Sequence, residues 1–297
     1  MLKGIFTPMM TAFYNDGKID FKGNEQVINS LIDGGVNGIL FLGSTGEFFS
    51  MTMEQKKEFV SFVIKIVNNR VKVIIGTGGT VVDEVIELTK YAEKEGADAA
   101  IVVTPYYYKL DNDCLYEFYS AIAKSIKLPI IIYNFPDRTA TNIDPKLVLR
   151  LAKDYKNIVG IKDTVDNMSH TRQLIQTVKS EVKEFAVFSG YDEYLIPNLL
   201  AGGNGIVGGL SNITPELFVN LYKAYNENNM RNIISLQEKV NYLMKLYEIY
   251  PIFMPVVKVA LQFMGHNITT KTSSPLGTLS DEQINEIKEI LTQAGLI

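Results

Sequence analysis

The sequence predicts an α/β protein with a (β/α)8 TIM barrel and a C-terminal three-helix extension, and two observations support this fold class. Short β-branched runs alternate with amphipathic helical stretches, and this pairing repeats eight times in about 225 residues. The strand candidates are continuously apolar, as expected when both faces of a parallel sheet are buried. Eight such units in one domain favour a closed barrel over an open, doubly wound sheet.

The predicted strands share a high content of Val, Ile and other apolar residues. They lie at residues 4–9, 38–44, 71–79, 99–105, 129–134, 158–164, 185–190 and 205–212. The stretches between them place apolar residues at helical spacing. These predicted helices lie at residues 22–35, 52–69, 82–96, 113–126, 144–155, 169–182, 194–203 and 214–225.

Several residues favour the predicted helix ends. The sequence "TMEQ", which starts at Thr52, is a capping box. Asp144 and Thr214 each precede a proline, which is the pattern of a cap followed by proline at the first helical position. Gly96 and Gly202 stand where helices are expected to end.

The pattern changes after residue 228. Three further helices, with no strand between them, are predicted at residues 231–250, 255–265 and 280–295. We therefore expect a catalytic barrel over residues 1–228 and a helical extension, packed on the barrel, over residues 229–297. No linker or low-complexity segment separates the two, so independent folding units are not expected.

Composition argues against several classes of protein. The 297 residues carry a net charge of −4 with both signs mixed along the chain, so a nucleic-acid partner is not expected. No apolar run approaches the ~18–20 residues that a membrane span needs. The single cysteine, Cys114, allows no intrachain disulfide. We expect a soluble, cytoplasmic protein that does not bind membranes.

The sequence predicts no metal site and no external cofactor. No cluster of His, Cys or carboxylate residues has metal-ligand spacing, and there is no phosphate-binding loop. The two histidines, His170 and His266, lie on a predicted helix and near a helix end. We expect both to be structural or surface residues.

Functional residues of such barrels lie at the carboxyl ends of the strands. Six predicted strands end in polar sequence: "GSTGE" (43–47), "TPYYYK" (104–109), "YNFPDR" (133–138), "GIKDT" (160–164), "SGYDE" (189–193) and "GIVGGLSN" (205–212).

Lys162 stands at the end of an apolar strand, where an ammonium group is unexpected. Alternation along the strand places Ile158, Gly160 and Lys162 on one face, and Gly160 leaves room beside the lysine. Burial lowers the pKa of an amine, because it disfavours the charged form. A neutral amine attacks a ketone to give a Schiff base. Alternatively, the lysine reaches solvent or pairs with Asp163.

Other strand ends carry groups that complement an amine nucleophile. Tyr133 ends the preceding strand and could relay protons. Ser44 and Thr45 supply hydroxyls on a glycine-flanked turn, and the amides of Thr45 and Gly46 suit a small carboxylate. Glu47 could be a buried carboxylate that braces this loop.

"GSTGE", "YNFP" and "GIKDT", in this order at these strand ends, resemble the dihydrodipicolinate synthase / N-acetylneuraminate lyase family. The resemblance extends nearly end to end and includes the three trailing helices. It implies a (β/α)8 barrel in which a lysine of the sixth strand forms a Schiff base with pyruvate or another 2-oxo acid. No other cofactor is implied.

The resemblance also implies roles for individual residues. Lys162 resembles the Schiff-base lysine, Tyr133 the proton-relaying tyrosine, and Ser44 the hydroxyl that links this tyrosine to a second one. That second tyrosine, which the family inserts across a subunit contact, is Tyr107 here, so a homotetramer or homodimer is implied. Two further positions resemble substrate binders: Thr45 with the Gly46 amide for the pyruvate carboxylate, and the backbone carbonyl of Val207.

The motifs leave the branch of the family open. "IGTGGT", "YNFP", "GIKDTVD" and "GYDEYL" together most resemble the 2-keto-3-deoxy sugar-acid aldolases, which join or separate pyruvate and an aldehyde. Asp192 and Glu193 would then hold a polyol chain, or alternatively cap the following helix. Arg138 instead matches the arginine with which 4-hydroxy-tetrahydrodipicolinate synthases hold aspartate semialdehyde. A catalytically silent barrel that binds a small acid is a third alternative, against which Lys162, Tyr133, Ser44 and Thr45 argue.

Overall fold

The structure, a computed structural model, describes residues 2–297 and contains eight parallel strands ordered as a closed barrel, β1 to β8 in sequence order. The strands are β1 (Gly4–Pro8), β2 (Gly38–Phe41), β3 (Lys72–Gly76), β4 (Ala99–Val103), β5 (Ile130–Asn134), β6 (Ile158–Asp163), β7 (Ala186–Ser189) and β8 (Gly205–Val207). Nearly every strand residue is buried, which explains why the runs are continuously apolar. The predicted fold class is confirmed.

The α-helices follow the strands in the predicted order. They are α1 (Phe21–Asp33), α2 (Met53–Val67), α3 (Val82–Glu95), α4 (Asn112–Ser125), α5 (Pro136–Thr139), α6 (Pro145–Asp154), α7 (Met168–Lys179), α8 (Leu195–Leu200), α9 (Pro215–Asn226), α10 (Met230–Leu243), α11 (Phe253–Phe263) and α12 (Asp281–Gln293). Four short 3-10 helices are η1 (Phe48–Ser50), η2 (Asp192–Tyr194), η3 (Gly209–Asn212) and η4 (Met244–Tyr247). Among residues 2–297, none of these helices has the length and apolar character to cross a membrane.

Most of the predicted helix ends are observed. Thr52 and Gln55 form the reciprocal capping box, and the Asp144 side chain accepts from the Lys146 amide. Thr214 is the cap residue of α9, but its side chain makes no capping hydrogen bond. Gly96 ends α3 in the left-handed conformation (φ 100°), whereas α8 already ends at Leu200, before Gly202.

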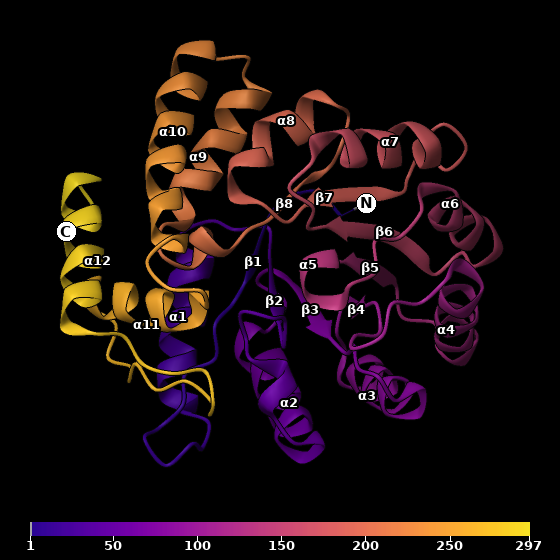
Figure 1. Cartoon of the computed structure of the whole chain (residues 1–297), viewed down its shortest axis with the longest axis horizontal. Coiled ribbons are helices and arrows are strands. Elements are labelled where there is room, and N and C mark those ends of the chain that lie inside the picture. The colour runs from indigo at the N-terminus through magenta and orange to yellow at the C-terminus, as the bar shows by residue number, and fades with distance from the viewer. Residues whose placement is uncertain (1) are drawn as a thin grey trace. The chain divides into compact units, whose positions relative to one another are not determined.

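The described chain groups into two compact units. The first comprises the segment up to Gly4 together with Lys72–Val207, and holds β3 to β8. Within it, α3, α4, α6 and α7 follow one another along the outside of the strands, each packed against the next (Figure 1). The Gly4 amide donates to the Asn204 carbonyl, so the amino-terminal segment joins this unit at β8.

The second unit comprises Ile5–Val71 and Gly208–Ile297. Within it, α1 packs against α2, α9 against α10, and α11 against α12 (Figure 1). The last three α-helices are those predicted for the extension. The predicted division at residue 228 stays a prediction, since these contacts group the extension with Ile5–Val71 rather than by itself.

Strand β6 departs from simple alternation. Ile158 and Gly160 lie opposite the consecutive residues Ile130 and Ile131 of β5, so one extra residue interrupts the ladder between them. The prediction that Ile158, Gly160 and Lys162 share one face therefore holds only from Gly160 onward. Gly160 is also required for a different reason from the one expected. A Cβ at Gly160 would lie 2.8 Å from the Ala186 carbonyl oxygen, so the glycine admits the backbone of β7.

Gly160→Ala is expected to lower the free energy of unfolding by about 1–3 kcal/mol, because the added methyl overpacks against a backbone that cannot yield. Gly79→Ala is the matched control, since its Cβ would meet Val85 at an ordinary 3.5 Å. Urea denaturation of both variants measures the difference. Equal stabilities of the two variants would contradict this account of Gly160.

Candidate active site

The candidate site in the first unit begins with a lysine and a tyrosine at the carboxyl ends of β6 and β5. In the parallel ladder between these strands, Tyr133 lies opposite Lys162. The Lys162 Nζ lies 3.4 Å from the Tyr133 hydroxyl and 4.4 Å from the centroid of its ring. The two side chains expose only 5% and 4% of their surface. An amine and a hydroxyl that can exchange protons are thus held together away from solvent.

The structure excludes both alternatives for Lys162. Burial excludes a side chain that reaches solvent, and Asp163 is engaged elsewhere. The Asp163 carboxylate accepts from Asn134 Nδ2 at 2.8 Å and from the Thr171 hydroxyl at 2.7 Å, and His170 Nδ1 lies 3.1 Å from both of its oxygens. Within residues 2–297, Lys162 forms no ion pair.

This second cluster lies directly behind the first. Asn134 lies opposite Asp163, one residue beyond Tyr133 and Lys162 on the same two strands. Successive side chains of a strand point to opposite faces. The Asn134–Asp163 pair therefore ties the two strands together on the face opposite Tyr133 and Lys162.

His170 can compensate the negative charge of this cluster when it is protonated. Its Nδ1 faces the Asp163 carboxylate and its Nε2 lies 3.2 Å from the Ile143 carbonyl oxygen, so an imidazolium can donate to both. Burial alone would lower the pKa of His170. The hydrogen bond and charge of Asp163, with smaller contributions from the Ile143 carbonyl and Asp144, outweigh burial and raise that pKa above its ordinary value. The expectation of a structural histidine is correct, and its partner is the residue after Lys162.

A group of acidic and aromatic residues follows β5, β6 and β7. The Tyr191 hydroxyl donates to Asp137 at 3.4 Å, and the Tyr194 hydroxyl donates to Asp166. Burial and the nearby carboxylates raise the pKa of Tyr191 to about 12. Burial, with Asp166 nearby, also raises the pKa of Glu193. The group is rich in acceptors and negative charge.

Arg138 and Asp192 lie close to this group in the sequence but differ in exposure. Arg138 is exposed on α5, with its guanidinium 5.8 Å from the Phe135 ring centroid. Arg138 does not pair with the adjacent Asp137, because neighbouring helical residues point in different directions and Asp137 accepts from Tyr191 instead. Asp192 is 1% exposed and opens the short helix η2, so it is a buried first-turn acid.

Two buried threonine hydroxyls in the first unit have no hydrogen-bond partner within residues 2–297. They belong to Thr104, after β4, and Thr164, after β6. The backbone amides of both residues are satisfied, since they donate to the Tyr133 and Asn134 carbonyls. Buried hydroxyls are rarely left without a partner, so these two are exceptions among the buried side chains of the first unit.

In the second unit, "GSTGE" forms a tight turn after β2. Ser44 and Thr45 are half-buried, and within residues 2–297 their hydroxyls and the Thr45 amide have no hydrogen-bond partner. The Gly46 amide was expected to be open to a carboxylate, but it donates to the Gly43 carbonyl at 3.0 Å and closes the turn. Thr45 is therefore the donor that the turn leaves available for an anion.

The remaining predicted positions lie in the first unit. Tyr107 is 86% exposed on the loop between β4 and α4, with a positive φ of 89°. That conformation is rare for a residue with a side chain. Val207 ends β8 and is buried. Within residues 2–297, no group of three or more His, Cys, Asp or Glu side chains could hold a metal ion.

The chain resembles known proteins over its whole length. The family model described as "Dihydrodipicolinate synthetase family" matches residues 1–294. The chain belongs to the dihydrodipicolinate synthetase family. Members of this family are class I, pyruvate-dependent aldolases and lyases, so the chain is an enzyme of that kind. The resemblance seen in the sequence motifs is thereby confirmed.

Relatives within the family carry two kinds of name. A probable 2-dehydro-3-deoxy-D-pentonate aldolase of Escherichia coli K12, YjhH, is 37% identical over 294 residues, which are 99% of this chain and 98% of YjhH. A 4-hydroxy-tetrahydrodipicolinate synthase of Methanocaldococcus jannaschii is also 37% identical, over the full length of both proteins. The crystal structure of E. coli YagE in complex with pyruvate matches with a TM-score of 0.97 at 37% identity, covering 99% of each chain.

His170 should make the stability of this protein depend on pH. Its pKa is higher in the folded state than in the unfolded state, so its ion pair stabilises the fold fully below the unfolded value near 6.5. This contribution is lost as the pH rises through the folded pKa. We expect the stability difference between the parent and His170→Gln to narrow as the pH rises from about 6.5, in urea denaturation at a series of pH values.

His266 supplies a control of opposite sign. Burial lowers its pKa, so the folded state resists protonation of His266. The stability of the parent relative to His266→Gln should therefore increase as the pH rises toward about 6.5. A difference between the parent and His170→Gln that does not vary with pH would show that His170 is neutral in the folded protein.

Proposed function

We propose that this enzyme is a 2-keto-3-deoxy sugar-acid aldolase in which Lys162 forms the Schiff base with the 2-oxo acid. The observation that carries the proposal is the buried Lys162 amine, 3.4 Å from the Tyr133 hydroxyl and without a carboxylate partner in residues 2–297. Such an amine is a nucleophile with a proton relay beside it. The names of YjhH and YagE, aldolases of 2-dehydro-3-deoxy acids, support this branch.

The proposed reaction needs only these two side chains and the substrate. The Lys162 amine adds to the C2 carbonyl, and loss of water from the carbinolamine gives the imine. Tyr133 accepts the C4 hydroxyl proton while the C3–C4 bond breaks, and can return it to C3 afterwards. The aldehyde leaves, the bonding electrons pass into an enamine, and protonation at C3 restores the imine. Addition of water releases pyruvate and the amine, and condensation is the reverse.

The surroundings of the pair favour a neutral, hydroxylated aldehyde. The group formed by Asp137, Asp166, Tyr191, Glu193 and Tyr194 offers acceptors for substrate hydroxyls and repels an anionic aldehyde. Of the two acidic residues expected to hold the polyol, Glu193 fits this role, whereas Asp192 is buried at the start of η2 and fits the alternative of a first-turn acid.

A second candidate is 4-hydroxy-tetrahydrodipicolinate synthase, which one observation favours. The Arg138 guanidinium is exposed and, within residues 2–297, forms no ion pair, so it is free to bind the carboxylate of aspartate semialdehyde. The M. jannaschii relative carries this activity in its name. The two candidates share Lys162 and Tyr133 and differ only in the aldehyde.

The remaining roles follow the same proposal. Thr45 holds the carboxylate of the 2-oxo acid, with Ser44 and the Gly46 backbone completing the turn, and the Val207 carbonyl faces the substrate. Tyr107, exposed and conformationally unusual, fits a residue that enters a neighbouring subunit, so we propose a homodimer or homotetramer. Location in the cytoplasm, without an external cofactor, belongs to the same proposal.

The decisive experiment traps the imine. Pyruvate and borohydride should add one reduced pyruvyl group to the peptide that contains Lys162, and Lys162→Ala should abolish this adduct, because Lys162 is the amine held beside the Tyr133 hydroxyl. Mass spectrometry of the digested protein measures both. Labelling at another lysine, or the absence of any labelling, would contradict the mechanism and favour a barrel that only binds small acids.

Tyr133→Phe separates proton relay from imine formation. The variant keeps the ring against Lys162 but loses the hydroxyl, so turnover should fall by roughly 10²–10⁴, the usual range for loss of general acid–base catalysis. Trapping of pyruvate should fall less, because water can assist dehydration of the carbinolamine. Near-normal turnover would remove Tyr133 from the mechanism.

Arg138→Ala distinguishes the two candidate substrates. With glyceraldehyde or glycolaldehyde, condensation by the variant should stay within about tenfold of the parent, because an exposed arginine contributes little to a neutral substrate. Aspartate semialdehyde should be a poor substrate for the parent. If the parent instead prefers aspartate semialdehyde and Arg138→Ala removes this preference, the synthase assignment replaces the aldolase.

A further inference from the structure

A buried ion pair in the second unit lies directly after the "GSTGE" turn. Lys258 of α11 and Glu47 are both fully buried, with Nζ and Oε1 2.5 Å apart. The other Glu47 oxygen, Oε2, accepts from the Ser273 amide at 2.6 Å. Lys258 Nζ also donates to the Lys271 carbonyl at 2.6 Å and lies 4.9 Å from the Phe13 ring centroid. Two segments of the C-terminal extension thus hold the Glu47 carboxylate.

The backbone of Glu47 is constrained as well. It occupies the left-handed region (φ 60°, ψ 32°), which is uncommon for a residue other than glycine. Such conformations persist only where the surroundings determine them. The Glu47 amide donates to the Ser44 carbonyl at 3.1 Å, and the Thr11 hydroxyl donates to the Gly46 carbonyl at 2.8 Å. The orientation of Glu47 therefore fixes the turn from Ser44 to Gly46.

Stability alone is a weak reason for this ion pair. Desolvation of two buried charges opposes their attraction, and well-packed apolar residues of similar volume often serve stability equally well. Desolvation lowers the pKa of Lys258 in spite of the opposing effect of Glu47. What an apolar pair cannot supply is a directional contact that fixes one carboxylate, and hence one backbone conformation, beside Thr45.

We propose that Glu47 and Lys258 form a positioning pair that holds the Thr45 amide and hydroxyl in the geometry that receives the carboxylate of the 2-oxo acid. The pair deepens the proposed function, on which its role depends, because that function assigns the carboxylate to Thr45. Neither residue is catalytic, since each acts through the turn. Through Lys258, the C-terminal extension takes part in substrate binding.

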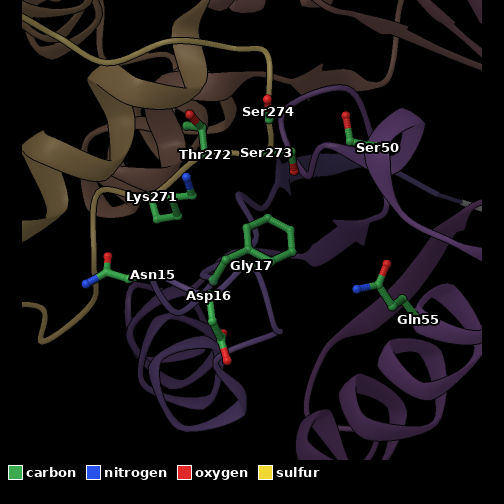
Figure 2. A pocket seen from close by; sticks show the side chains of 10 residues that line it. Asn15, Asp16, Gly17, Ser50, Gln55, Lys271, Thr272, Ser273 and Ser274 are labelled. Carbon is green, nitrogen blue, oxygen red and sulfur yellow. The ribbon is translucent and has the colours of Figure 1, made fainter.

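A cavity of about 300 Å³ lies beside this pair and supplies a control residue. Figure 2 shows Lys271, Thr272, Ser273 and Ser274 along one wall, and Ser50 and Gln55 across from them. The Lys271 side chain lines the cavity, whereas its carbonyl contacts Lys258. Lys271→Ala therefore removes a neighbouring lysine side chain but leaves the contact to Lys258 in place.

The test measures the pyruvate concentration that half-saturates borohydride trapping and turnover, in the full-length protein. Glu47→Gln keeps the shape of the side chain and removes its charge. We expect the half-saturating concentration to rise about tenfold or more, with kcat at saturating pyruvate changed less than about threefold, because the loss lies in binding rather than chemistry. Lys271→Ala should match the parent in both quantities. An unchanged half-saturating concentration in folded Glu47→Gln would overturn the proposal.

A double variant separates the positioning role of the pair from its contribution to folding stability. Glu47→Leu combined with Lys258→Met replaces the pair with apolar side chains, which commonly preserves folding. We expect a thermal midpoint near that of the parent but a raised half-saturating pyruvate concentration. Parental pyruvate affinity in this variant would overturn the proposal. Failure of both Glu47→Gln and the double variant to fold would also overturn it, since the pair would then serve folding.

Thr45→Ala distinguishes failure of the positioning role from failure of the proposed function. If Thr45→Ala leaves pyruvate affinity unchanged, the carboxylate is not bound at the turn and the proposed assignment of Thr45 fails. If Thr45→Ala weakens pyruvate binding but Glu47→Gln does not, the assignment of Thr45 stands and the positioning role of the pair fails.

Discussion

The parallel ladder between β5 and β6 is the constraint on which the proposed catalytic pair, Tyr133 and Lys162, depends. A single register aligns Tyr133 with Lys162 on one face and Asn134 with Asp163 on the other. Because side chains alternate, a slip of one residue in β6 would break both pairs and could bring the Asp163 carboxylate opposite Tyr133 in place of the Lys162 amine. The hydrogen bond from Asn134 to Asp163, and those from Thr171 and His170 of α7, hold the strands in the productive register.

Two buried carboxylates perform comparable tasks in the two units. Asp163 follows Lys162, the proposed nucleophile, and contacts His170, while Glu47 follows the proposed substrate turn and pairs with Lys258. In each case the acid makes several directional contacts that an apolar residue could not make. Buried ion pairs contribute little net stability, so their positions beside functional groups indicate that geometry is what they provide.

Much of the fold was accessible from sequence because its signals are local. Continuous apolar runs marked the strands, helical spacing marked the helices, and the caps at Thr52 and Asp144 involve residues only two or three positions apart. The roles of Lys162 and Tyr133 came from the strand-end motifs and the family resemblance.

The remaining features depend on contacts that no local pattern encodes. The extra residue in β6 displaced Ile158 from the expected face, and the close approach of β7 decided the need for Gly160. The Gly46 amide is not open to a carboxylate, because it donates to the Gly43 carbonyl and closes the turn. The sequence predicts a structural or surface role for His170, but no local sequence pattern predicts Asp163 as its partner. No sequence pattern predicts that Lys258, 211 residues after Glu47, pairs with it.

The second unit combines an early and a late part of the chain, Ile5–Val71 and Gly208–Ile297, and this has a consequence during synthesis. All residues of the first unit, including Tyr133, Lys162 and the Asp163–His170 cluster, have been made once translation passes Val207. Glu47 must wait a further 211 residues beyond its own synthesis for Lys258. At about 5–20 residues per second this is on the order of 10–40 s. During that interval the Glu47 carboxylate lacks its partner Lys258, so the turn that we propose to bind the substrate carboxylate is among the last parts of the molecule to mature.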